Sequence, residues 1–166
     1  MVILNPYICQ LDPCLHTFAY VRKKSAFLLS AILAVSSKFL DTSLYGRLYR
    51  HAQNLVTDCF RRGSKSTEIV QAILTLTYWK EPQDTRVFTS LGYAIRMCFD
   101  MGWHKLVPHP SRRQPLEVED SRRVLRNIER TWYVLFVYDR RYVFPPIVST
   151  NLMILLTFLQ HEPSDR

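Results

Sequence analysis

Apolar residues recur at helical spacing in five separate segments, and this pattern constrains the fold of the chain more than any other feature. The segments are residues 25–40, 43–62, 66–79, 84–102 and 117–141. Gly63 follows the second segment as a helix stop, and Ser66 and Asp84 precede the next two as capping residues. The pattern predicts an all-α fold, a multi-helix array of about five or six packed helices. We further expect the domain to be truncated at its C-terminal side.

The fourth and fifth segments each have an apolar side that we expect to be buried. In the fourth segment this side consists of Phe88, Leu91, Gly92, Ile95 and Phe99. Gly92 within it indicates a close approach to a neighbouring helix. In the fifth segment the apolar side consists of Leu125, Ile128, Trp132 and Leu135.

Charged residues flank both of these apolar sides. The spacing of the fifth segment places Asp139 next along its apolar side and Glu129 beside it, while Arg96 flanks the fourth segment. An isolated charge is costly to desolvate unless a partner compensates. We therefore predict that Asp139 or Glu129 pairs with Arg96 or Arg130, and Arg140 belongs to the same group of structural ion-pair candidates.

The two ends of the chain differ from its centre, residues 25–141. Residues 1–24 contain Pro6 and Pro13 without sustained periodicity, so we predict an irregular lead-in. In residues 142–166 a helix-breaking Pro-Pro pair at 145–146 is followed by an apolar stretch without charge, residues 147–159. Our hypothesis is that this atypical tail is a foreign or truncated end, for example from intron read-through.

Composition indicates one globular domain in a reducing compartment. The chain is 48% hydrophobic, which is enough for a core, and it has only 4 cysteines in 166 residues. A net charge of +8 allows nucleic-acid binding, but the basic residues are scattered, so a solvated basic surface is the preferred interpretation. No secretory signal is evident, and no apolar run reaches the ~18 residues of a membrane span, so we expect no membrane partner.

No catalytic, cofactor-binding or metal-binding constellation is recognisable, and we expect no enzyme activity. Cys9, Cys14 and His16 lack the paired Cys-x-x-Cys spacing of a zinc site and are interpreted as loop residues. His104 is interpreted as a packed residue near a helix end. The sequence has no nucleophile elbow, His-Glu-x-x-His motif or phosphate-binding glycine loop.

Several aromatic residues follow the same helical stripes as leucine and isoleucine. They are Tyr78, Trp79, Trp103 and Trp132. Spacing of this kind favours a place in the core. The alternative, that they line a ligand pocket between helices, stays open.

Three groups of residues carry a resemblance to a known family. They are the helix 72–79, the segment from Leu91-Gly92-Tyr93-Ala94-Ile95-Arg96 to Gly102-Trp103-His104, and Arg130-Thr131-Trp132 with Asp139-Arg140. This combination resembles the regulatory, or middle homology, region of fungal binuclear zinc-cluster transcription factors. The six-cysteine cluster that binds DNA and zinc in that family has no counterpart in the sequence, and no Gly-Arg-Pro-like segment follows Asp139-Arg140.

The resemblance implies a fragment that regulates transcription in the nucleus. DNA and zinc binding would belong to the family's N-terminal cluster, and a small-molecule effector or a coregulator protein would be the partner. The alternative hypothesis is a helical protein-interaction module, capable of self-association, or a truncated non-functional fragment.

Overall fold

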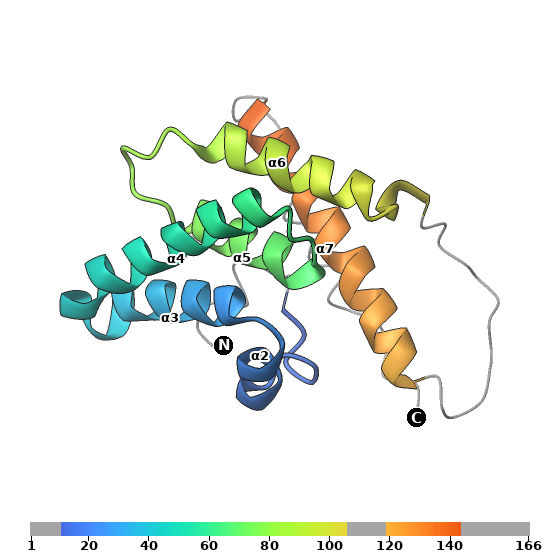
Figure 1. The fold of residues 1–166 in the computed structure, drawn as a ribbon, viewed down its shortest axis with the longest axis horizontal. Coiled ribbons are helices and arrows are strands. Elements are labelled where there is room, and N and C mark those ends of the chain that lie inside the picture. Colours follow the sequence, from blue (N-terminus) through green and yellow to red (C-terminus); the bar gives the residue numbers. More distant parts are fainter. Residues whose placement is uncertain (1–10, 106–118, 144–166) are drawn as a thin grey trace.

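The computed structural model describes residues 11–105 and 119–143, and all regular secondary structure in these ranges is helical (Figure 1). The elements are α2 (Phe18–Lys24), α3 (Ala26–Leu40), α4 (Thr42–Arg62), α5 (Thr67–Tyr78), α6 (Val87–Asp100), the 3-10 helix η1 (Trp103–Lys105) and α7 (Glu119–Val143). The predicted all-α array of packed helices is confirmed. No described helix combines the length and apolar character needed to cross a membrane.

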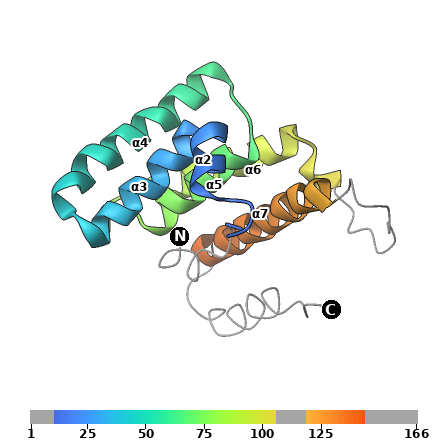
Figure 2. The same cartoon turned by 90° about the horizontal axis from the view of Figure 1, so that it is seen from below.

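Helix α5 is the centre of the array. Every residue from Glu68 to Thr77 is buried, because α3 packs on one part of α5 while α6 and α7 pack on others. Helices α3 and α4 pair side by side, and α7 crosses on the far side of α5 from them (Figures 1 and 2). A helix enclosed in this way must satisfy its polar side chains with protein partners.

Helix boundaries follow local capping chemistry. Gly63 ends α4 with a φ of 64°, and its N–H donates to the carbonyls of Cys59 and Phe60. The Ser66 hydroxyl accepts from the Ile69 N–H at the start of α5, so both predictions are confirmed. The predicted cap at Asp84 is wrong: α6 begins later, at Val87, and Arg86 occupies the cap position without a side-chain hydrogen bond. Asp84 instead accepts from the Arg86 N–H within the preceding turn.

The prediction of an irregular lead-in is wrong for residues 17–24. Thr17 caps α2 by accepting from the Tyr20 N–H, and Val21 is buried. Leu11 and His16, which precede this helix, are buried as well. A seven-residue helix with one buried side chain leaves no periodic signal, so the sequence pattern could not indicate it.

The buried side of α6 differs in part from the prediction. Leu91 is buried as expected, but Phe88 is 68% exposed and Phe99 is 49% exposed. Ala94, Met97 and Cys98 take their places in the core. Gly92 is not a point of close helix approach, because a Cβ built there would meet only the Arg96 guanidinium of the same helix.

The buried side of α7 is rotated relative to the predicted one. Leu135 is buried, whereas Leu125 is 44% exposed. The positions that face the core include two polar residues, Asn127 and Thr131. The predicted helix over 117–141 extends to Val143, and the remainder of the atypical tail lies outside the described residues.

Candidate functional site: a buried polar network

Four buried polar side chains from three parts of the chain meet at the centre of the fold. They are His16, Gln71, Asn127 and Thr131, and we call them the Gln71 network. The Gln71 amide nitrogen donates to Asn127 Oδ1 over 2.8 Å and to Thr131 Oγ1 over 3.0 Å. Its amide oxygen lies 3.2 Å from His16 Nε2. One side chain of α5 therefore joins the N-terminal segment to α7.

His16 makes hydrogen bonds through both ring nitrogens, to Asp12 on one side and to Gln71 on the other. His16 Nδ1 lies 2.9 Å from the Asp12 nitrogen and 3.1 Å from the Asp12 carbonyl oxygen, so it bonds to Asp12 as acceptor or donor according to the tautomer, while a hydrogen on Nε2 can be donated to Gln71. Burial lowers the pKa of His16, and this effect outweighs the bonds and the nearby carboxylates of Asp12 and Glu68, which act in the opposite direction. The network thus joins three parts of the fold without a buried charge.

Helix α7 contributes two residues to the network from successive turns. Thr131 donates its hydroxyl to the Asn127 carbonyl over 2.7 Å while it accepts from Gln71. Specific hydrogen bonds therefore hold both of these buried side chains. Apolar periodicity does not reveal this site; two polar residues four apart, beside the apolar seam, were the available signal.

Two further contacts hold the N-terminal segment, which we define as residues 11–24. An Arg130 nitrogen lies 3.8 Å from Asp12 Oδ2. The Tyr20 hydroxyl donates to Glu68 Oε1 over 3.4 Å. Both are longer and more exposed than the bonds of the Gln71 network, so His16 is the principal polar anchor of this segment.

The structure does not bring together the predicted ion pairs. Arg96 donates to the carbonyl of Gly92 in its own helix over 3.1 Å, and the Arg140 guanidinium lies 5.7 Å from the ring centre of Phe136. Arg130 faces Asp12, a partner that was not predicted. Within residues 11–105 and 119–143, Glu129 and Asp139 are half-buried and form no ion pair with Arg96 or Arg130.

The four predicted pocket aromatics separate into two groups. Tyr78 and Trp79 pack on each other at 5.0 Å between ring centres, whereas Trp103 and Trp132 pack at 6.3 Å beside α6 and α7. The structure has a hollow of about 30 Å³ between α4, α5 and α6 and an open depression of about 330 Å³ beside the α5–α6 loop. None of the four aromatic residues lines either of them. The structure thus places these aromatics in packing contacts.

The metal-site candidates are not gathered either. Cys14 is exposed, His16 is committed to the Gln71 network, and Cys9 lies outside the described residues. His16 lies in the loop before α2, as the sequence suggested, but its side chain is buried, at 1% exposed. In the described part of the chain, no three metal-ligating side chains gather into a group.

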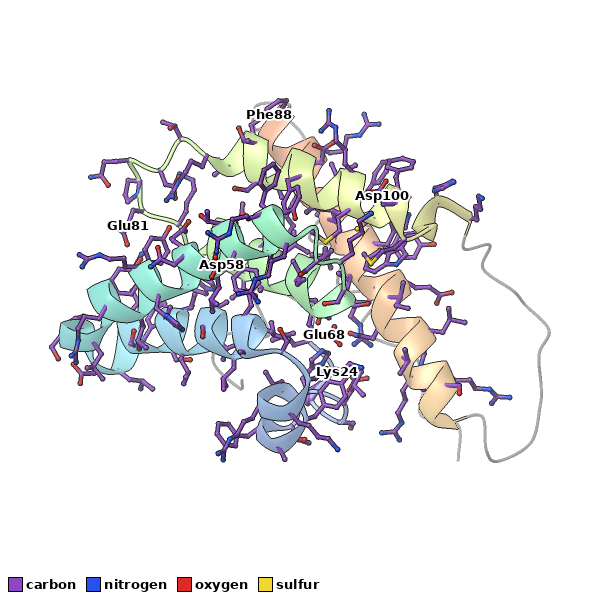
Figure 3. The ribbon with its side chains drawn as sticks, in the orientation of Figure 1. Lys24, Asp58, Glu68, Glu81, Phe88 and Asp100 are labelled. Carbon is purple, nitrogen blue, oxygen red and sulfur yellow. The ribbon has the colours of Figure 1, made fainter. Side chains whose placement is uncertain are left out.

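A second polar cluster lies beyond the other end of α5. It ties α3 and α4 to the loop between α5 and α6 and consists of Lys38, Tyr45, Tyr49, Glu81, Asp84 and Arg86, which we call the loop clasp. Lys38 Nζ lies 2.9 Å from Glu81 Oε1, and Arg86 contacts Asp84 over 2.7 Å. Figure 3 shows Glu81 of the clasp well apart from Glu68 near the start of α5.

Hydrogen bonds to the two carboxylates dominate the electrostatics of the loop clasp. Bonds from Tyr45 and Lys38 lower the pKa of Glu81, and the Arg86 guanidinium holds the pKa of Asp84 well below its usual value. Burial, together with the neighbouring carboxylates, raises the pKa of Tyr45 and Tyr49. These groups satisfy one another, so the arrangement is suited to fixing the loop.

Comparison with known proteins identifies the domain. The family model described as the fungal specific transcription factor domain matches residues 9–144. The chain belongs to this family. The match begins before α2, so it includes His16 and the N-terminal segment as well as the Gln71 network. No solved structure matches the chain.

A relative in a mushroom supports the same assignment. Over 140 residues the chain is 39% identical to Protein priB of Lentinula edodes, an alignment that covers 82% of this chain and 22% of that protein. The chain therefore spans about a fifth of the length of this relative.

Proposed function

We propose that this chain is a regulatory region of a fungal transcription factor, acting in the nucleus without reading DNA bases itself. The family match over residues 9–144 is the observation that carries the proposal. The family's domain type argues against a catalytic role, and the Gln71 network contains neutral groups already engaged with one another. DNA and zinc binding would belong to a zinc cluster elsewhere in a longer protein.

The Gln71 network supports a role in relaying a signal. In the family that the chain resembles, the zinc cluster is N-terminal to the regulatory region, so its connection would enter through residues 11–24. His16 fixes this segment to α5, and α5 contacts α3, α6 and α7. A coregulator or small effector that shifts any of these helices would alter the position of the segment, with the buried Gln71–His16 bond as the principal polar link.

A reporter assay tests the proposal. The chain is fused to an unrelated DNA-binding domain, and reporter output is compared with that of the DNA-binding domain alone. We expect the fusion to change the output, Gln71→Leu to abolish the change, and Gln53→Leu on the surface of α4 to preserve it. Unchanged output from a well-expressed, folded fusion would overturn the proposal, as would base-specific DNA binding by the isolated chain.

Exposed aromatic residues favour a second function, a protein-interaction module. Phe88 and Phe99 on α6 and Tyr133 and Phe136 on α7 are all exposed, and Phe88 is labelled in Figure 3. Exposed apolar surface of this kind marks association sites. Sizing chromatography tests self-association: a dimer that Phe136→Ser converts to a monomer supports it, and a monomer at high concentration contradicts it.

A further inference from the structure

The turn after α4 carries a serine preceded by two arginines. Residues 61–64 read Arg61-Arg62-Gly63-Ser64, which places arginines three and two positions before the serine. Protein kinases select substrates in part by charge pattern around the acceptor residue. A kinase whose substrate cleft presents carboxylates at these two positions would recognise this tetrapeptide.

The residues of this turn are accessible. Arg61, Arg62, Gly63 and Lys65 are exposed, and Ser64 is partly exposed. The Ser64 N–H donates to the Cys59 carbonyl over 3.0 Å, but its hydroxyl makes no hydrogen bond to any residue that the structure describes. The acceptor oxygen therefore needs no structural bond to be broken before it reacts.

The last turn of α4 lies largely at the surface, with Phe60 packed edge-on against the Tyr93 ring of α6 at 5.3 Å. Phe60 is 69% exposed, and Arg61 is held by a surface pair with Asp58 four positions from the helix end. Surface pairs contribute little, and helix ends with few buried contacts open locally well below the global unfolding energy. An extended conformation of residues 61–64, which a kinase cleft requires, is therefore within reach of the folded protein.

A second basic serine in the chain provides an internal contrast. Ser25 follows Arg22-Lys23-Lys24, but its hydroxyl accepts from the Leu28 N–H over 3.1 Å and caps α3. Its backbone also ends α2. Extending this serine would break the junction of two helices, one of which carries the buried Val21. Both serines follow basic residues, but the Ser25 hydroxyl caps a helix and the Ser64 hydroxyl does not.

We propose that Ser64 is a phosphorylation site for a serine/threonine kinase that selects arginines two and three residues before the acceptor. The Ser64 oxygen bonds to the γ-phosphorus of ATP, the bond from that phosphorus to the β–γ bridging oxygen breaks, and ADP leaves. The hydroxyl proton passes to the catalytic carboxylate of the kinase. This site is independent of the proposed role of the Gln71 network.

The phosphate would act on the neighbouring Lys65. Lys65 Nζ lies 2.8 Å from Asp100 Oδ2, and this pair links the α4–α5 turn to the end of α6, where Figure 3 labels Asp100. Both side chains are about half exposed, so the pair is weak. A phosphoserine with a charge of about −1.5 to −2 would compete for Lys65. Phosphorylation therefore loosens the attachment of α6 to this turn.

Phosphate mapping tests the site directly. The folded full chain is incubated with Mg-ATP and the catalytic subunit of a kinase with this arginine preference, and modified residues are located by mass spectrometry. We expect Ser64 to be phosphorylated, Ser64→Ala to lose that phosphate, and Ser25→Ala to leave Ser64 modification unchanged. Absence of phosphate on Ser64, or preferential modification of Ser25, would overturn the proposal.

A second variant leaves Ser64 in place, so a folding defect caused by replacing this serine cannot explain the result. Arg62→Gln retains Ser64 but removes one recognition charge, so Ser64 phosphorylation should slow while the melting temperature stays unchanged. Equal rates for Arg62→Gln and the natural chain would contradict recognition through the arginines. Hydrogen exchange of residues 97–102 should accelerate on phosphorylation and in Lys65→Ala, and unchanged exchange would contradict the effect on α6.

Discussion

Two polar clusters, one around Gln71 within α5 and one beyond the C-terminal end of α5, hold the fold by different means. The Gln71 network is buried, neutral and formed by short side chains, whereas the loop clasp is partly exposed and ionic. A buried polar group left without a partner costs more than an exposed one, because water cannot replace the partner. The buried, uncharged cluster should therefore contribute more to stability than the cluster with two ion pairs.

Replacing the central amide is expected to produce the largest difference between the clusters. Gln71→Leu removes the partner of His16 and Asn127 inside the core, so the free energy of unfolding should fall by about 3 kcal/mol. Urea denaturation measures the loss. Gln53, which accepts from Arg86 at the surface, offers the matched control: Gln53→Leu should change stability by less than about 0.5 kcal/mol. Equal losses of stability in Gln71→Leu and Gln53→Leu would contradict the larger contribution of the buried network.

Acidification should weaken the buried network before it affects the loop clasp. Burial lowers the pKa of His16 from 6.5, so the unfolded chain binds its proton at higher pH than the folded chain. Stability should therefore decrease as the pH falls below 6.5, and it should be fully retained above that value. Thermal melts across this range measure the slope. His16→Asn should flatten it, and an unchanged slope in that variant would assign the effect to other groups.

Removing the better-protected carboxylate of the loop clasp should have a moderate effect. Asp84 accepts from Arg86 and Tyr49, but Arg86 is largely exposed, so Asp84→Ala should cost about 1 kcal/mol. Its pKa is depressed from 3.8, so this contribution is present above pH 3.8 and is lost as the pH falls further. Chemical denaturation at neutral pH measures the loss of stability. A loss as large as that of Gln71→Leu would contradict the larger contribution of the Gln71 network.

The smallest effect is expected at the Lys38–Glu81 pair. Its side chains are about one-third exposed, so Lys38→Met should cost about 0.5 kcal/mol or less. Added salt should reduce that cost because ions screen exposed charges. Denaturation at low and high salt provides the measurement. A cost that is insensitive to salt would mean that Lys38 acts through packing, for instance on the Tyr45 ring, which its amine faces at 5.3 Å.

The sequence predicted the parts of the fold in which local and tertiary preferences agree. The long apolar segments became α3 to α7, and Gly63 and Ser66 mark helix ends as expected. Apolar periodicity did not predict the buried sides of α6 and α7 correctly: Phe88 and Leu125 are exposed although they fit the apolar stripes. Tertiary contacts, which one sequence does not reveal, decided which side of α6 and α7 faces α5.

Most of the candidate site could not be predicted from the sequence. His16 lies in a segment without periodicity, and its partner Gln71 is 55 positions away. Asn127 and Thr131 could have been noticed as polar residues one helical turn apart, but nothing in their spacing identifies Gln71 as the group between them. Burial of charge is costly, and the fold places two amides, a hydroxyl and an imidazole with a lowered pKa at its centre instead of the predicted ion pairs.

The coupling between His16 and Gln71 tests most directly whether the N-terminal segment is anchored in the core by this bond. A double-mutant cycle with His16→Ala, Gln71→Ala and the double variant measures it by urea denaturation. We predict that the losses of unfolding free energy in the two single variants, added together, exceed the loss in the double variant by about 1 kcal/mol or more. Losses that add within about 0.3 kcal/mol would contradict the account.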